Sequence, residues 1–367
     1  MSIYISIKQK LINPFLSVRT KLLRFNMAAN AKNEGREFVR KFNFDKLNKE
    51  EIKIAKAYWK SKGFKLDNTI WHQYYKGATG NFVKEYVPHD IFSSHIAPSL
   101  NQKIQWPALL DKNLSYNLFK GYKQPKLVIS NINGFYFNNG EIISELEAVQ
   151  ICSKSSSKLV VKPSIESGGG FMVNVLSIQD IVEEEIVEHI INMFKSYNRD
   201  FVVQEFVEQS PVMAKLNKSS LNTLRIMSYL NNGGVHIVSS VLRIGNAGKS
   251  TDNFATGGVA CGVKNTGRLK EIGFIQDGTT LTKTTSGIVL KEVLIPNYNN
   301  VLKMVELLHK RVPYFRIISW DIGIDKNNDA ILIEYNTYNQ STKIHQIVNG
   351  PLFGTFTNEI LAEACQC

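Results

Sequence analysis

The chain has 367 residues, 43% of them hydrophobic, which is enough for one large domain or two to three smaller ones with a sizeable core. Its four cysteines are too few and too scattered for a disulfide framework or a zinc site, and no apolar run reaches the roughly 18 residues of a membrane-spanning helix, so we expect a cytoplasmic protein. The net charge of +12 favours anionic partners, but no nucleic-acid-binding motif accompanies it, so nucleic acid is not expected among them.

Residues 1–105 are predicted to form a mainly helical N-terminal region. Residues 1–25 mix Lys and Arg with Ile, Leu and Phe and lack a signal-peptide cleavage pattern. Two interpretations remain open for them: a basic amphipathic helix in peripheral contact with the inner face of a membrane, or a surface helix packed on its own protein. Further on, helices are predicted over Asn33–Phe42 and Lys49–Lys62. Asn48 and Glu51 have the spacing of a capping box for the second of these.

Residues 106–207 are predicted to form a subdomain of mixed helices and strands. Ser144 and Glu147 form a capping box for a helix that runs to about Cys152. The other predicted elements are a short helix from Leu109, strands Lys126–Ser130, Gly134–Phe137, Lys158–Pro163 and Phe171–Val175, a helix Asp180–Tyr197 and a strand Phe201–Glu208.

A lysine and a glycine-rich loop stand together in this part of the chain. Lys162 lies at the end of a buried strand and is followed by Ser167, Gly168, Gly169 and Gly170. Glycines let backbone N–H groups turn towards an anion without side-chain clashes, and the lysine adds a point charge, so the pattern indicates phosphate binding. A flexible hairpin without a ligand is the alternative. The pattern is neither a P-loop nor a dinucleotide fingerprint.

Residues 208–367 are predicted to form a second subdomain. Arg225 and Arg243 lie in strand-like apolar sequence, the latter within the predicted strand Gly234–Ile244. A buried guanidinium needs an anionic partner, which is either a carboxylate or a phosphate. A polar, glycine-bearing loop from Asp252 leads into another strand, and a helix is predicted over Asn300–His309.

The segment Ile317–Gln346 begins with a predicted β-hairpin, whose turn is rich in Asp and Asn. Pairing Ile322 with Ile333 and Ile324 with Ile331 places Asp321 directly opposite Glu334. In that register one face holds Trp320, Ile322, Ile324, Ile331, Ile333 and Tyr335. The other face holds Ser319, Asp321, Gly323, Leu332, Glu334 and Asn336.

The acidic face of this hairpin predicts a metal site. Carboxylate and amide oxygens without His or Cys suit a hard cation, and Mg²⁺ fits best. Two acids on a solvated sheet face are the alternative. If the metal site is correct, Asp321→Asn or Glu334→Gln is expected to leave the fold intact and to remove the activity that depends on the metal.

The order of these features resembles the ATP-grasp superfamily from about Leu109 to the C-terminus. Particular strings resemble the sugar-transfer-associated ATP-grasp family of bacterial surface-polysaccharide biosynthesis, and aromatic strings extend the resemblance back to about residue 65. These strings are Lys162-Pro163 with Glu166–Gly170, Ser220–Arg225, Asp252-Asn253 with Gly257-Gly258, Trp320–Ile322, and His345-Gln346 before Gly350–Gly354.

The resemblance implies an α+β ATP-grasp fold, in which two subdomains with antiparallel sheets enclose ATP, preceded here by the helical region. It implies that Lys112 and Lys162 contact the α- and β-phosphates and that Arg225 or Arg243 stabilises the γ-phosphate. It further implies two Mg²⁺ ions on Asp321, Glu334 and Asn336, triphosphate contacts from Ser167, Gly168, Gly169 and Gly170, and adenine and ribose contacts from Gln204, Glu205, Phe206 and Val207. Acceptor-side contacts fall to Asn222, Asn253, Gly257, Gly258, Lys343, His345 and Gln346.

The resemblance also implies a carboxylate–amine ligase that acts through an acylphosphate. We expect it to join an amino acid or another amine to a uronic-acid carboxylate of a capsular polysaccharide or O-antigen. Two alternatives remain: an ATP-dependent sugar kinase with Asp252 as its base, and a non-catalytic glycan-binding protein with a degenerate nucleotide site. The joint presence of Lys162, Asp321, Glu334 and Asn336 disfavours the last.

Overall fold

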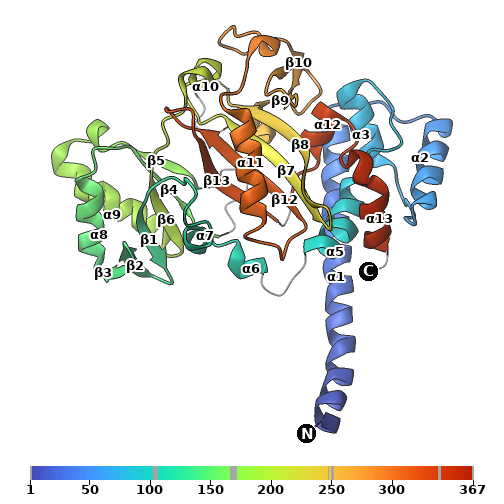
Figure 1. Ribbon diagram of the computed structural model, residues 1–367, viewed down its shortest axis with the longest axis horizontal. Helices are drawn as coiled ribbons and strands as arrows, with labels where there is room; N and C mark the ends of the chain where they lie inside the picture. The colour runs from blue at the N-terminus through green and yellow to red at the C-terminus, as the bar shows by residue number, and fades with distance from the viewer. Residues whose placement is uncertain are drawn as a thin grey trace.

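The chain folds into two antiparallel β-sheets and a helical N-terminal region that packs beside the second sheet (Figure 1). In this computed structural model the backbone is described for residues 2–101, 106–165, 172–246, 248, 252–337 and 340–365. Side chains are described in the same ranges except at residues 2–20, 106 and 107. The predicted α+β class is confirmed, while the glycine-rich loop at residues 167–170 lies outside the described residues.

The N-terminal region is helical, as predicted. Its helix α1 (Ser2–Lys41) joins the basic N-terminal segment and the helix predicted over Asn33–Phe42 into one element of 40 residues. The capping box of α2 (Lys49–Ser61) is confirmed, because the Asn48 side chain accepts a hydrogen bond from the Glu51 amide at 2.8 Å and the Glu51 side chain accepts one from the Asn48 amide at 2.9 Å. The other helices here are α3 (Ile70–Thr79), α4 (His89–Ile91), α5 (Ala97–Asn101) and α6 (Trp106–Leu109). Among the described residues, no helix combines the length and the apolar content needed to cross a bilayer.

The first sheet has the strand order β3-β2-β1-β6-β4-β5, and each neighbouring pair is antiparallel. Its strands are β1 (Leu127–Ile132), β2 (Phe135–Asn138), β3 (Glu141–Ile143), β4 (Leu159–Pro163), β5 (Asn174–Leu176) and β6 (Phe201–Glu205). Helices α8 (Glu145–Ser153) and α9 (Ile186–Tyr197) pack on this sheet, and Val149, Phe194 and Phe201 are among the buried side chains between them. The short helix α7 (Lys112–Leu118) lies against β1 and β6.

Three predicted boundaries in this part of the chain are wrong. β5 begins at Asn174 rather than Phe171, because Met172 has a φ of +51°, which a strand does not accommodate. The helix predicted from Asp180 begins at Ile186, since Glu183–Glu185 forms a separate 3₁₀ turn. β6 ends at Glu205, three residues earlier than predicted.

The capping box of α8 gives a stability prediction. Ser144 accepts a hydrogen bond from the Glu147 amide at 3.2 Å, and the Glu147 side chain accepts one from the Ser144 amide at 2.8 Å. Ser144→Ala is expected to lower the free energy of unfolding by about 1 kcal/mol, because the first turn loses an acceptor for its amide. Urea unfolding checks this, with exposed Ser156→Ala as the control. Equal losses in both variants would contradict the capping role.

The second sheet has the order β11-β10-β9-β8-β7-β12-β13 and is also antiparallel throughout. Its strands are β7 (Thr223–Asn231), β8 (Gly234–Ile244), β9 (Val259–Val263), β10 (Leu269–Phe274), β11 (Thr280–Leu281), β12 (Ile317–Ile324) and β13 (Ala330–Asn336). The bounds of β8 match the prediction. The associated helices are α10 (Pro211–Leu216), α11 (Tyr298–His309), α12 (Lys343–Asn349) and α13 (Thr357–Cys365).

The two faces of this sheet differ in what covers them. On one face α11 packs on the apolar side chains of β7, β8 and β12, and Trp320 is fully buried there. On the other face α12 and α3 pack over Val241 of β8 and Ala260 of β9. Since Val241 is directly opposite Arg225 on β7, helix α12 shares its face of the sheet with the predicted arginine.

The acidic hairpin is β12–β13, and its register is partly as predicted. Asp321 is opposite Glu334, which confirms the predicted acid pair. A β-bulge between this pair and the turn shifts the remaining register, so Ile322 pairs with Leu332 instead of Ile333. Leu332 therefore joins the buried core with Trp320 and Ile322, whereas the side chains of Ile331 and Ile333 lie against Gly323 on the acidic face. The predicted placement of Ile331 and Ile333 on the face of Trp320, and of Leu332 on the acidic face, is wrong for this reason.

Candidate active site

A row of functional side chains crosses the second sheet. Val241, Arg225, Asp321 and Glu334 stand directly opposite one another on β8, β7, β12 and β13. They share one face of the sheet because successive side chains of a strand point to opposite faces, and the apolar residues next to them in the sequence fill the buried face. Two hairpins that are distant in the sequence, β7–β8 and β12–β13, thus bring an arginine between a hydrophobic residue and two acids.

Asp321 is held by two arginines. Its Oδ1 and Oδ2 atoms lie 2.5 and 2.8 Å from Nε and Nη2 of Arg225, and Nη2 of Arg243 lies 3.3 Å from Oδ1. Only 3% of Asp321 is exposed. Burial acts to raise its pKa, but the two guanidinium groups outweigh burial and hold the pKa below its usual value. Asp321 therefore fixes both arginines in place.

A second carboxylate, Asp252, orients Arg243 through a threonine. Its Oδ2 accepts hydrogen bonds from the Thr223 amide and hydroxyl at 3.0 and 2.5 Å, and Nε of Arg243 lies 3.3 Å from the same oxygen. Arg243 also donates to the Thr223 hydroxyl. Burial raises the pKa of Asp252 despite the neighbouring arginine. The role of Thr223 is missed from the sequence, since nothing in its local pattern points to Arg243 on the next strand.

Two lysines reach this row from the first sheet and the helix beside it, Lys162 from β4 and Lys112 from α7. Nζ of Lys112 lies 3.1 Å from Oε1 of Glu334, and the Lys112 amide donates to the carbonyl of Ser164 just beyond β4, which holds the start of α7 beside that strand. Lys162 at the end of β4 is 8% exposed, and none of the described residues forms an ion pair with its ammonium group. Burial and then the charge of Lys112 lower its pKa to about 8, although Glu334 and Asp321 act in the opposite direction. Among the described residues, four cations thus surround the three carboxylates of Asp252, Asp321 and Glu334.

The lowered pKa of Lys162 predicts a pH-dependent affinity for polyphosphate. Its ammonium loses its proton as the pH rises through about 8, and an anion binds the protonated form. We expect ADP affinity to be highest below pH 8 and to fall above it, by up to about tenfold per pH unit. In Lys162→Arg the side chain stays charged above pH 8, so the ADP affinity of this variant is expected to show no break near that pH. Calorimetric titration from neutral to alkaline pH checks the prediction, and a break that persists in Lys162→Arg would contradict it.

The residues present fit a hard cation at the end of β13. Glu334 has a side chain that is 31% exposed, and the side-chain nitrogen of Asn336 is buried without a hydrogen-bond partner. Since no hydrogen bond holds this nitrogen, the Asn336 amide is a candidate to turn its oxygen to a cation, as is the Glu334 carboxylate. Both oxygens of Asp321 already accept hydrogen bonds from guanidinium groups, so Glu334 and Asn336 are the better donors. No group of three or more His, Cys, Asp or Glu side chains suited to a metal occurs in the described part of the chain.

The predicted adenine-binding segment lies at the end of β6. Gln204 is 5% exposed and donates to the Tyr116 hydroxyl of α7 at 3.4 Å. Glu205 forms an ion pair with Lys126 at 2.7 Å. Phe206 and Val207 follow the strand as irregular backbone, and the Phe206 amide donates to Lys158. The segment thus connects the two sheets beside α7.

Three of the predicted acceptor residues lie on α12, and His345 is the one that the charges of Arg225, Asp321 and Arg243 reach. Its Nδ1 is 2.8 Å from the Ser239 hydroxyl on β8, and its Nε2 is buried without a partner among the described residues. Burial, followed by the charge of Arg225, lowers its pKa to about 3, so the ring is neutral. Lys343 instead pairs with Glu34 of α1. Gln346 donates to the Val87 carbonyl and accepts from the Val87 amide, which joins α12 to the segment before α4.

The other predicted acceptor residues organise loops next to the row. Asn222 is fully buried, and its side chain donates to oxygens of Gln209, Met213 and Asn217. The Asn253 side chain accepts from the Ala255 amide at 3.0 Å. Gly257 has a φ of +95°, and a Cβ atom at Gly258 would lie 2.8 Å from the Asp252 carbonyl oxygen. These residues shape the loop that carries Asp252.

Among solved structures the chain is similar to several enzymes at low identity. They include an L-amino acid ligase from Bacillus licheniformis (14% identity, 70% of this chain and 48% of that chain, TM-score 0.42) and a D-alanyl-alanine synthetase from Vibrio cholerae (14%, 70% and 64%, 0.39). A third is the biotin carboxylase domain of 2-oxoglutarate carboxylase from Hydrogenobacter thermophilus (16%, 69% and 45%, 0.40). The chain spans about half to two thirds of the length of these proteins.

No curated protein matches the chain. The family model "Sugar-transfer associated ATP-grasp" matches residues 92–360. This match includes both sheets and every residue of the charged row. The chain therefore belongs to the sugar-transfer associated ATP-grasp family.

Proposed function

We propose that this protein is an ATP-dependent ligase that joins a carboxylate to an amine and releases ADP and phosphate. The observation that carries the proposal is the set of cations Lys112, Lys162, Arg225 and Arg243, which come from both sheets of an ATP-grasp protein. In the part of the chain that the structure describes, these cations outnumber the three carboxylates among them, so the set favours a further anion. A polyphosphate fits this excess positive charge.

Each residue has a role in the proposed reaction. Lys112 and Lys162 neutralise phosphate oxygens, and Glu334 with Asn336 would hold Mg²⁺, which supplies further neutralisation when bound. Arg225 and Arg243, fixed by Asp321 and Asp252, donate hydrogen bonds to the phosphoryl group during its transfer. Their counter-ions keep the guanidinium groups in position before ATP binds.

The proposed chemistry has two steps. A carboxylate oxygen of the acceptor attacks the γ-phosphorus, the bond to the β-phosphate oxygen breaks, and ADP leaves. The amine then attacks the carbonyl carbon of the acylphosphate, loses a proton, and phosphate departs with the bonding electron pair. Neither step needs a nucleophilic side chain, and positioning with charge neutralisation accounts for the catalysis.

The proposed acceptor is an acidic sugar, a uronic-acid unit of a capsular polysaccharide or O-antigen, and the proposed amine is an amino acid. The family's association with sugar transfer and the net charge of +12 support an acidic glycan. The proposal assigns the reaction to the cytoplasm, where ATP is supplied.

A sugar kinase is the second candidate, and the geometry disfavours it. A kinase needs a carboxylate base that is available to a hydroxyl group. The candidate base, Asp252, already accepts hydrogen bonds from Thr223 and pairs with Arg243. No observation on the described residues favours another base.

Hydroxylamine trapping tests the proposal. The protein is incubated with Mg-ATP, uronic-acid glycans and pooled amino acids, and ADP, phosphate and hydroxamate are measured. Hydroxamate that forms only with ATP and a carboxylate acceptor is the expected result, because hydroxylamine captures an acylphosphate. Stable phosphate on the sugar without hydroxamate would instead identify a kinase. Failure to bind ATP at all would overturn both enzyme assignments and leave a glycan-binding protein.

A further inference from the structure

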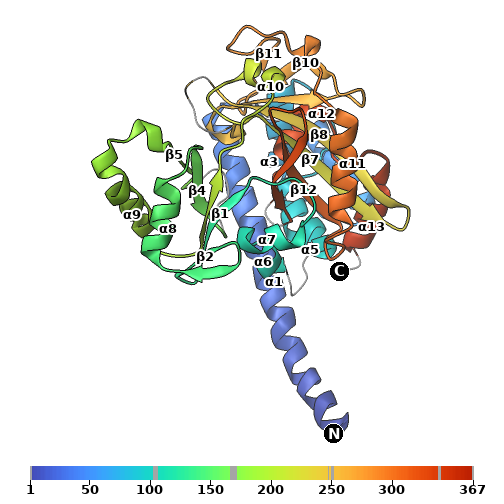
Figure 2. The same cartoon turned by 60° about the vertical axis from the view of Figure 1, so that its left-hand side comes forward.

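The two halves of α1 differ in their surroundings. The C-terminal half packs on the body: Phe38 contacts the rings of Trp71 and Tyr74, and Lys32 pairs with Asp67 at 3.1 Å. The N-terminal half extends away from both sheets and from the other helices in both views (Figures 1 and 2). A helix that projects in this way has a face available for a partner.

The extended half is basic throughout. Up to Glu34 the sequence has no Asp or Glu, and its basic residues before the packed part of the helix are Lys8, Lys10, Arg19, Lys21 and Arg24. A helix with this charge attracts an anionic surface. It also repels the same segment of a second copy, because neither copy offers carboxylates there. An anionic partner is therefore favoured over self-association.

Apolar residues recur at helical spacing through the same segment. Ile7, Leu11, Phe15, Val18, Leu22 and Phe25 follow one another at intervals of three or four positions. In a helix this spacing produces one continuous apolar stripe. At the end of the stripe Leu22 is 58% exposed and Phe25 is 72% exposed. Large apolar side chains at such exposure favour transfer into a hydrocarbon boundary.

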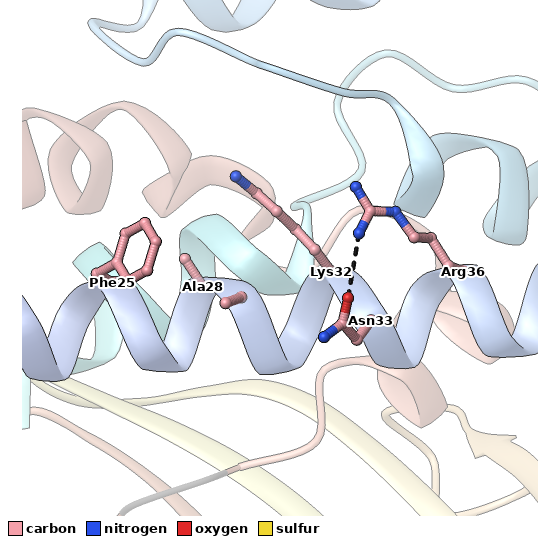
Figure 3. A pocket seen from close by; sticks show the side chains of 6 residues that line it. Phe25, Ala28, Lys32, Asn33 and Arg36 are labelled. Carbon is pink, nitrogen blue, oxygen red and sulfur yellow. Dashed lines mark hydrogen bonds between the residues drawn. The ribbon is translucent and has the colours of Figure 1, made fainter.

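The stripe continues into a small hollow with a basic rim. The spacing runs on from Phe25 through Ala29 to Lys32 and Arg36. Phe25, Ala28, Ala29, Lys32, Asn33 and Arg36 line a hollow of about 170 Å³ (Figure 3). The hollow therefore brings the apolar ring of Phe25 close to cationic side chains, at the point where the stripe meets the packed part of α1.

We propose that the N-terminal half of α1 docks on the surface of a bilayer that contains anionic phospholipid. The helix lies in the interface, with its apolar stripe in the acyl boundary and its Lys and Arg side chains among the phosphates. This inference does not depend on the proposed ligase activity. The proposed contact is peripheral, since the helix lies on the bilayer and does not cross it.

Vesicle sedimentation of the full chain tests the proposal. One vesicle set is pure phosphatidylcholine, and the other holds about three parts phosphatidylcholine to one part phosphatidylglycerol. Wild type is expected to bind the anionic vesicles at least about tenfold more tightly, and binding should weaken as salt rises. Equal binding to both sets, or binding to neither, would overturn the proposal.

Two pairs of matched variants separate the apolar and the charged contributions. Leu22→Glu with Phe25→Glu should reduce vesicle affinity at least about tenfold. The control is Ile142→Glu with Leu146→Glu, at positions in the first-sheet region that are 70% and 59% exposed, and it should bind like wild type.

The charged contribution is tested by Lys8→Gln, Lys10→Gln and Lys21→Gln together, which should make vesicle binding less dependent on salt. The exposed lysines of α2, changed by Lys53→Gln, Lys56→Gln and Lys60→Gln, serve as their control.

Two further measurements keep the outcome unambiguous. Thermal unfolding and ADP affinity are expected to match wild type in all four variants, which shows that the variants fold. Light scattering reports the oligomeric state. A wild-type dimer that Leu22→Glu with Phe25→Glu converts to a monomer, without vesicle binding by either protein, would overturn the proposal and make α1 an interface between copies.

Discussion

The Glu334→Gln variant is expected to fold like wild type and to lose ATP turnover by roughly 100-fold or more. Glu334 contributes the carboxylate that the proposed Mg²⁺ site needs, and it is the partner of Lys112. The amide keeps the size of the side chain but removes its charge. Because the Glu334 side chain is 31% exposed, the loss in stability should stay within about 1 kcal/mol. ADP release at several Mg²⁺ concentrations and urea unfolding check both parts.

A matched control uses an exposed ion pair. Glu208 lies 3.1 Å from Lys326, and both side chains are more than 60% exposed. Glu208→Gln makes the same chemical change outside the charged row, so turnover should stay at the wild-type level. Unchanged turnover in Glu334→Gln at every Mg²⁺ concentration would sink the assignment of Glu334 to the metal.

The Asp321→Asn variant is expected to lose about 3–5 kcal/mol of unfolding free energy. Asp321 is almost fully buried and is the shared counter-ion of Arg225 and Arg243. Removing its charge leaves two guanidinium groups in a buried site with less compensation. The sequence alone predicts that this substitution leaves the fold intact, and the ion pairs revise that expectation. Urea unfolding with and without saturating ADP measures the loss.

A double variant tests the reason for this loss. Asp321→Asn combined with Arg225→Met removes the carboxylate and its bidentate partner together, so it should recover part of the stability that Asp321→Asn loses. Additive losses in the double variant would contradict the counter-ion role. Full stability of Asp321→Asn alone would do the same.

Much of the fold can be predicted where the information is local. The capping boxes at Asn48 and Ser144 form as predicted, and β8 has the predicted bounds. The helix α12 is missed because Thr342–Gln346 is polar and carries no side-chain cap. The full extent of α1 is missed because no start or stop signal marks the junction between its two halves. Local signals thus predict where single helices and strands form better than they predict whether two neighbouring segments join into one helix.

The charged row is predictable only in part. The opposition of Asp321 and Glu334 follows from alternation within one hairpin. The pairing of Asp321 with Arg225 depends on β7 lying next to β12, although the two residues are 96 positions apart in the chain. From the sequence alone, the anionic partner of each arginine can be a carboxylate or a phosphate. In the structure both arginines pair with carboxylates. That result depends on sheet topology, which no local pattern specifies.

The β-bulge in β13 has a consequence for how the length of this hairpin can vary during evolution. Between the turn and Glu334, β13 holds one residue more than the ladder with β12 requires. Deletion of one residue from Ala330–Ile333 would close the bulge and leave Asp321 opposite Glu334. For a deletion of Tyr335 no extra residue compensates, so Asn336 shifts to the opposite face of the sheet. Relatives whose hairpins are one residue shorter before Glu334 are therefore expected to retain the acid pair.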